Sequence, residues 1–124
     1  MEPGLIPNIW SPLGPDSSAF RACRNRSQRD IRSGQAKASL FYRRSAETGL
    51  SVGLTIQRTI RDIRPEGVFQ LRIGDVRSCR EPLHVAQDEP EHAEIQGVPV
   101  FQENEQLALE IAGHLARHAR VVVL

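Results

Sequence analysis

The sequence predicts a small α+β domain in which a mixed, mostly antiparallel sheet carries two helices. Three observations lead to this fold class. Short segments with apolar residues at every second position indicate half-buried strands. Two other segments repeat apolar residues every three to four positions, as amphipathic helices do. Finally, a chain of 124 residues can bury one modest core.

Composition favours an ordinary globular protein, with 40% hydrophobic and 25% charged residues. No apolar run approaches the ~20 residues that a membrane span needs. Residues 1–4 do not read as a secretory signal, so we expect a cytoplasmic protein. Cys23 and Cys79 lie far apart without a CxxC spacing, and we expect two free thiols.

Residues 1–37 are predicted to be a disordered Pro/Arg-rich arm. Four prolines interrupt the first fifteen residues, and the arginine-rich stretch that follows contains few large apolar side chains. The folded domain is then expected to span residues 38–124. An alternative function for the arm is binding nucleic acid through its phosphates.

Three extended segments are predicted before the acidic part of the chain. Residues 39–44 are rich in strand-forming side chains. Residues 49–54 form a loop or a short extended piece with a glycine at each end of GLSVG. Residues 68–73 alternate, which places Phe69, Leu71 and Ile73 inward.

A helix is predicted over residues 55–63, between the second and third of these segments. Thr55 is a suitable N-cap. The pattern turns three isoleucines towards the core and three arginines away from it. The isoleucines are Ile56, Ile60 and Ile63, and the arginines are Arg58, Arg61 and Arg64.

A β-hairpin over residues 82–99 is predicted to organise the rest of the sheet. Leu83 and Val85 alternate before the turn, and Ala93 and Ile95 alternate after it. Turn chemistry places the loop at residues 88–91. This register sets His92 opposite Gln87 and His84 opposite Ile95.

The strongest periodic signal belongs to a helix that begins after Asn104, a suitable N-cap. Its apolar stripe comprises Leu107, Ala108, Ile111, Ala112, Leu115 and Ala119. Residues 121–124 are predicted to be a fully buried last strand or a tail that docks on the core.

The charge distribution suggests a function. Residues 81–110 contain eight acidic residues and no lysine or arginine, whereas the chain before them is basic. The leading hypothesis is a non-catalytic interaction or regulatory module that acts through protein–protein contacts or self-association. Its contacts would use the basic helix face and the acidic hairpin tip, namely Arg58, Arg61, Arg64, Asp88, Glu89 and Glu91.

The alternative is a small enzyme acting on a nucleotide or a phosphorylated substrate. Arg43 would clamp an anion, His92 would act as acid or base, and Glu94 would assist beside Ser51. These side chains would have to converge on one pocket. An internal salt bridge between Arg43 or Arg44 and the acidic hairpin competes with this role.

No metal or cofactor is predicted. His84 and His92 share a segment with carboxylates, but the expected register does not make them cross-strand partners. His114 and His118 are four residues apart on a helix, yet HLARH lacks the glutamate of an HExxH site. We expect both pairs to be solvated surface groups.

The pattern YRRS…GLSVGLT…EHAEIQGVP, from residue 42 to 99, resembles uncharacterised small bacterial proteins. The order of Arg43, Ser51 and Glu94 also resembles that of the arginine, serine and catalytic glutamate in ADP-ribosyltransferases. The sequence Glu94-Ile95-Gln96 departs from the acid-x-Glu ending of that family. The second resemblance implies an enzyme that acts on a nucleotide.

Overall fold

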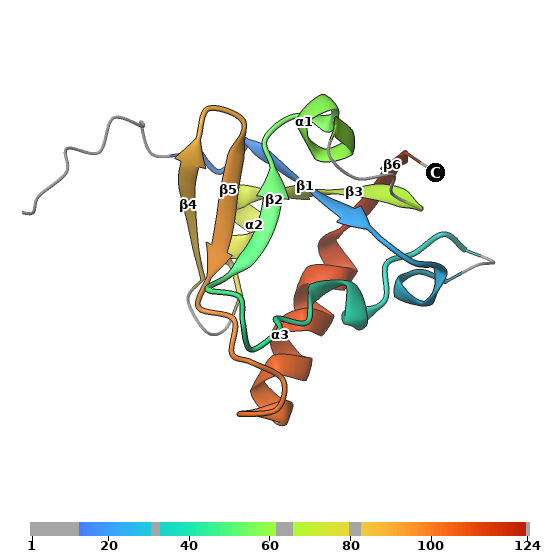
Figure 1. The fold of residues 1–124 in the computed structure, drawn as a ribbon, viewed down its shortest axis with the longest axis vertical. Helices are drawn as coiled ribbons and strands as arrows, with labels where there is room; N and C mark the ends of the chain where they lie inside the picture. Colours follow the sequence, from blue (N-terminus) through green and yellow to red (C-terminus); the bar gives the residue numbers. More distant parts are fainter. Residues whose placement is uncertain (1–12, 31–32, 62–65, 80–82, 124) are drawn as a thin grey trace, which may run out of the picture.

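The computed structural model describes residues 13–30, 33–61, 66–79 and 83–123, and within them it shows a six-stranded antiparallel sheet with three α-helices (Figure 1). The predicted α+β class is confirmed, with one helix more than expected. The strands are β1 (Ser18–Cys23), β2 (Leu50–Gly53), β3 (Gly67–Arg72), β4 (His84–Glu89), β5 (His92–Gln96) and β6 (Arg120–Val123). The α-helices are α1 (Ile56–Arg61), α2 (Ile73–Arg77) and α3 (Glu105–His118), and two 3₁₀ helices are η1 (Arg26–Gln28) and η2 (Ala38–Phe41).

The sheet consists of two groups of strands that meet at one weak junction. Its order is β4-β5-β2-β1-β3-β6. β1 pairs with β3 along its whole length, but it pairs with β2 only at Phe20 and Gly53. In Figure 1 β4, β5 and β2 run together, and β1 and β3 cross them at a wide angle. The sheet therefore opens between β1 and β2 on either side of that single pair.

The prediction of disorder through residue 37 is wrong for β1, which lies in the middle of the sheet. Ala19 and Cys23 are fully buried and belong to the core. The charged residue between them is accommodated because the Arg21 guanidinium donates to two main-chain carbonyls, those of Leu40 and Ser51. Residues 1–12 of the predicted arm lie outside the described residues.

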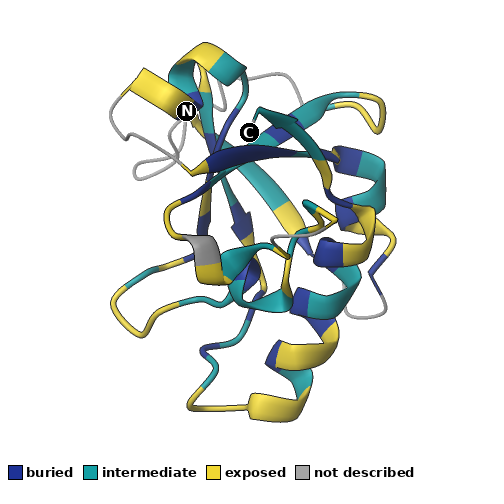
Figure 2. Cartoon of the chain, turned by 90° about the vertical axis from the view of Figure 1, so that its right-hand side faces the viewer, coloured by how far each residue is buried: buried dark blue, intermediate teal, exposed yellow. Residues whose placement is uncertain are grey.

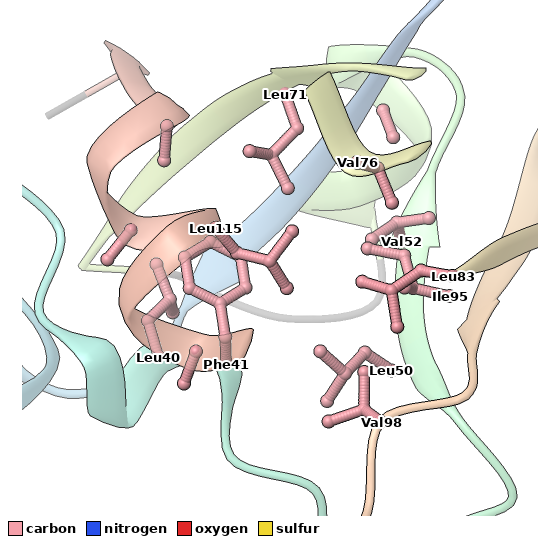
Figure 3. Close-up of a cluster of buried hydrophobic side chains, with 14 of the residues drawn as sticks. Leu40, Phe41, Leu50, Val52, Leu71, Val76, Leu83, Ile95, Val98 and Leu115 are labelled. Carbon is pink, nitrogen blue, oxygen red and sulfur yellow. The ribbon is translucent and has the colours of Figure 1, made fainter. Parts of the chain in front are cut away.

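The core lies between the sheet and α3, with η2 beside the helix (Figure 3). The Asn104 side chain accepts a hydrogen bond from the main-chain N–H of Leu107 at 3.2 Å, which confirms the predicted cap. The predicted stripe is also confirmed: Ile111 and Leu115 are fully buried. Figure 2 shows buried positions along the side of α3 that meets the sheet and exposed positions on its other side.

The predicted strand over residues 39–44 is replaced by η2. Leu40 and Phe41 are neighbours in the chain, and both are buried, with 1% and 0% exposure. Successive residues of a strand point to opposite faces of a sheet, so a strand could not bury both against one core. In a 3₁₀ helix successive side chains are only about 120° apart, so both can reach the core.

Helix α1 begins as predicted, because the Thr55 hydroxyl accepts a hydrogen bond from the main-chain N–H of Arg58 at 3.0 Å. Its inward face is not the predicted row of isoleucines. Ile60 is 42% exposed, and the buried residue of the helix is Thr59. Ile63 and Arg64 lie outside the described residues. The helix is short and turns a polar side chain towards β2, which leaves no deep apolar contact for Ile60.

The hairpin and the last strand form the two edges of the sheet, so the hairpin is not its centre. A bulge between Gln87 and Glu89 changes the predicted register: His92 pairs with Glu89, and His84 pairs with Gln96. β6 is half-buried at the other edge and not fully buried as predicted. Leu124 lies outside the described residues.

Two further features complete the fold. Phe69 and Leu71 of β3 are buried as predicted, but their neighbour Val68 is buried as well. Ile73 is buried too, yet it begins α2, which follows β3 directly where a turn was expected. Cys23 and Cys79 are both buried free thiols. No helix in the described part of the chain combines the length and apolar character needed to cross a membrane.

Candidate active site

Three side chains from β2 and the hairpin form a continuous hydrogen-bonded chain. The Ser51 Oγ atom lies 2.5 Å from Nε2 of His92. The other ring nitrogen of His92, Nδ1, lies 2.7 Å from Oδ1 of Asp88. The His92 side chain is 17% exposed and the Asp88 side chain 49%. The hydrogen-bonded chain therefore has a half-buried ring at its centre and ends at a carboxylate that contacts water.

The sheet register brings these groups together. β2 and β5 are antiparallel neighbours in which Gly53 pairs with His92 and Ser51 with Glu94. Ser51 and His92 thus lie diagonally on one face, whereas Leu50 and Val52 point into the core. Asp88 precedes the hairpin turn by two residues, and the bulge lets its carboxylate reach back to the ring.

The two partners of His92 determine which ring nitrogen carries the proton. The carboxylate of Asp88 can only accept, so Nδ1–H donates to it. In the neutral ring Nε2 then holds the lone pair and accepts a hydrogen bond from the Ser51 hydroxyl. A hydroxyl, a base that faces it and a carboxylate that orients the base are the parts of an activated nucleophile.

Ser51 and His92 lie on the wall of a groove with a volume of about 180 Å³. β1 and the residue that follows it, together with Gly53 of β2 and α1, supply the remaining wall, which is strongly basic. It comprises Phe20, Arg21, Ala22, Arg24, Gly53, Arg58 and Thr59. Sequence reasoning did not assign Arg21, Arg24 or Thr59 to a site. The two arginines belong to a segment that was placed outside the domain, and no local motif marks them.

A glycine sets how closely α1 approaches the groove. A Cβ on Gly53 would lie 2.1 Å from Oγ1 of Thr59, which is far inside contact distance. That hydroxyl is itself held, because it donates to the carbonyl of Thr55 at 2.8 Å. The absence of a side chain at residue 53 therefore allows α1 to pack against β2 and places Arg58 beside His92.

The predicted basic and acidic surfaces meet within the molecule. A guanidinium nitrogen of Arg58 lies 2.6 Å from Oε2 of Glu89, joining α1 to the hairpin tip. Asp88 is occupied by His92. Arg61 and Glu91 are exposed on α1 and at the turn, respectively, and Arg64 lies outside the described residues. Arg58, Asp88 and Glu89 of the predicted interaction surface thus have partners within the molecule, beside the groove.

We expect a modest coupling free energy of about 0.2–1 kcal/mol between Arg58 and Glu89, because the Glu89 side chain is 54% exposed and water screens the pair. A double-mutant cycle with Arg58→Gln and Glu89→Gln, followed by urea denaturation, measures this value. The coupling should decrease at 1 M salt. A coupling above roughly 3 kcal/mol would show that the pair is dehydrated.

The structure leaves Arg43 and Glu94 outside the groove. Arg43 donates from Nε to the carbonyl of Val98 at 2.5 Å, and from another guanidinium nitrogen to the carbonyl of Glu47. Its internal partners are therefore main-chain carbonyls and not the acidic hairpin. The carboxylate of Glu94 accepts from the hydroxyl of Thr48 at 2.9 Å.

The acidic tip also groups potential metal ligands. One atom each from Asp88, Glu89 and His92 lies within 4.8 Å of the others. However, both ring nitrogens of His92 and a carboxylate oxygen of Glu89 already have protein partners. A cation would have to displace these contacts, so we assign the cluster to the hydrogen-bonded chain.

The other histidines are not part of this arrangement. His84 lies at the opposite end of the hairpin from His92. The rings of His114 and His118 pack with centroids 4.6 Å apart. Nε2 of His114 lies 2.8 Å from the carbonyl oxygen of Asp75, so this nitrogen is a donor. His114 therefore contacts α2 and is not simply solvated. The His118 side chain is 41% exposed, and its Nδ1 lies 3.7 Å from Oδ1 of Asp75 on α2.

Comparisons with known proteins leave the function to be argued from this geometry. No family model, no curated protein and no solved structure matches the chain.

Proposed function

We propose that this protein is a small serine-dependent hydrolase that cleaves a carboxylic ester carrying negative charge. The hydrogen-bonded chain from Ser51 through His92 to Asp88 supports the proposal. It supplies a nucleophile, a base in the required tautomer and a group that orients the base. A cytoplasmic location fits the two free thiols.

The proposed reaction has two halves. Ser51 Oγ attacks the carbonyl carbon of the ester while its proton passes to Nε2 of His92. The bond to the leaving alcohol breaks, and the alcohol oxygen takes that proton, which leaves an acyl group on Ser51. Water then attacks the acyl carbon, gives a proton to His92, and releases the carboxylic acid as Ser51 regains its proton. Asp88 stabilises the ring while it is charged.

The basic wall of the groove supports a negatively charged substrate. Arg21, Arg24 and Arg58 line the same groove as Ser51, and positive charge there would also stabilise the oxyanion that forms at the carbonyl. The pKa of Arg21 is lowered to about 10, mainly because the guanidinium is buried; the nearby Glu47 opposes this change, and Arg24 and Arg44 contribute to it. Since this value is well above neutral, Arg21 remains charged at pH 7.

A fluorophosphonate probe tests the nucleophile directly, because it forms a covalent bond only with an activated serine. We expect peptide mass spectrometry to find the label on Ser51 and Ser51→Ala to abolish it. His92→Ala should slow labelling by roughly 10²–10⁴-fold, the usual contribution of a general base. Asp88→Asn should slow it through loss of the correct tautomer.

Ser78 provides the matched control. Its hydroxyl lies 3.4 Å from Nε2 of His114, but that nitrogen already donates to a carbonyl and cannot act as a base. Ser78→Ala should therefore label like the wild type. The proposal fails if Ser51 stays unmodified, or if His92→Ala reacts at the wild-type rate. Labelling that EDTA abolishes would instead indicate a metal at the acidic tip.

We also propose, as a second candidate, the interaction module predicted from the sequence, now acting by self-association. Its support is β6, an edge strand that contains three consecutive valines. Such an edge is a template for pairing with another chain. Native mass spectrometry should then find a dimer that Val122→Lys converts to a monomer, whereas Gln106→Lys on exposed α3 leaves the dimer intact. A monomeric wild type would refute this candidate.

A further inference from the structure

A second hollow, with a volume of about 760 Å³, lies next to the groove. Arg21, Ala22 and Arg24 line both spaces, so the groove and the hollow share a wall. The shared wall lies where the sheet opens between β1 and β2. There the guanidinium of Arg21 connects the two sides, because it donates to the carbonyl of Leu40 and, at 2.8 Å, to that of Ser51.

The hollow is strongly basic. Four arginines line it, opposed by the single carboxylate of Glu47. Among the residues that the structure describes, the guanidinium groups of Arg24 and Arg44 have no hydrogen-bond or ion-pair partner. Arg43 is held by two carbonyls and therefore shapes the wall. Arg24 and Arg44 can therefore bind an anion. A bound anion would also reduce the repulsion between these two arginines and Arg21.

An aromatic surface completes the hollow. Tyr42 and Phe101 both line it, and their rings pack with centroids 4.9 Å apart and planes inclined by 33°. Both side chains are only half-buried, so part of each ring contacts solvent. A flat ligand ring can stack on such a surface, and arginine beside it favours a ligand that also carries phosphate.

We infer that the hollow binds a nucleoside phosphate, with the phosphate on Arg24 and Arg44 and the base against Tyr42 and Phe101. The volume lies within the range of small-molecule sites. This inference rests on the proposed function and specifies its substrate: a carboxylic ester in which a ribose hydroxyl of the nucleotide is the alcohol. Attack by Ser51 transfers the acyl group to Oγ, and the nucleotide leaves with the proton from His92.

Calorimetric titration of the full chain with AMP tests the inference. AMP should bind, whereas adenosine and inorganic phosphate, which each lack half of the contacts, should bind at least tenfold more weakly. Arg24→Gln and Arg44→Gln should each weaken AMP binding at least tenfold, since each removes a charged hydrogen-bond donor to the phosphate. Tyr42→Leu should weaken the binding of AMP and leave the binding of inorganic phosphate unchanged.

Arg77→Gln is the matched control, because Arg77 is an exposed arginine on α2 that does not line the hollow. It should bind AMP like the wild type. The same titration with a short RNA distinguishes two sources of the ligand. Binding of AMP alone indicates a free nucleotide, and tighter binding of the RNA indicates a nucleic-acid end. Both results support the assigned chemistry. Absence of binding by AMP and by the RNA overturns it, as does equal weakening by Arg77→Gln.

The two proposals can fail separately. Ser51→Ala should retain AMP binding, because Ser51 does not line the hollow. AMP binding with no probe on Ser51 would refute the hydrolase and preserve the nucleotide site. Probe labelling of Ser51 in a protein that binds no nucleotide would support the hydrolase and refute the nucleotide site.

Discussion

Replacing Phe69 by alanine should lower the free energy of unfolding by about 3–5 kcal/mol, the usual loss for a buried aromatic side chain. Phe69 is fully buried in the middle of β3. It pairs with Arg21 of β1 on one side and with Val121 of β6 on the other. Its removal leaves a cavity where three strands meet the core. Urea denaturation measures the loss.

Leu109→Ala provides the comparison, because Leu109 is 40% exposed on the outer side of α3. We expect its free energy of unfolding to change by less than about 1 kcal/mol. A small protein has only about 5–15 kcal/mol of stability, so the loss from Phe69→Ala removes a large fraction of it. Equal effects of the two substitutions would contradict the burial of β3.

Replacing Gly53 by alanine should disrupt the groove while most of the core survives. The new methyl group would overlap the Thr59 hydroxyl at 2.1 Å, so α1 must move away from β2. Such overpacking costs roughly 1–3 kcal/mol. Because Arg58 moves with α1, probe labelling of Ser51 should slow as well. Urea denaturation and the labelling rate measure the two effects.

A second substitution distinguishes this mechanism from general damage. Thr59→Ala removes the atom that overlaps, so the double variant should recover part of the lost stability and labelling. Gly49→Ala should not be rescued in this way, since its methyl group would meet the main-chain carbonyl of Ile95 at 2.7 Å. Gly14→Ala, where the new methyl group would lie 3.9 Å from Oγ of Ser17, should behave like the wild type. Full labelling of Gly53→Ala would contradict the role given to α1.

The elements that could be predicted from sequence are those with a local signal. Helix α3 has a cap and a long apolar stripe, and the apolar residues Phe69 and Leu71 of β3 are two positions apart and both buried. β1 has no such signal, because Arg21 lies between two buried positions and small residues occupy much of the strand. Only the carbonyls of Leu40 and Ser51, which are distant in sequence, make that position suitable for arginine.

The candidate site was predictable as a set of residues but not as an arrangement. Ser51 and His92 were among the predicted catalytic residues, and Asp88 was assigned to an acidic surface. Their contact depends on the pairing of β2 with β5 and on the bulge near the turn. A shift of one residue in a strand reverses which face a side chain occupies, so the alignment of strands decides the chemistry.

The central place of β1 also governs how the chain folds. β1 is hydrogen-bonded to β3, and β3 to β6, so segments near the beginning, the middle and the end of the sequence form adjacent ladders. The chain must close long loops, at a cost in entropy, before these contacts can stabilise the fold, and this slows folding. During synthesis, residues 18–23 leave the ribosome well before residues 67–72 exist to pair with them. Until then β1 has two unpaired edges, and the nascent chain is most vulnerable to aggregation in this interval.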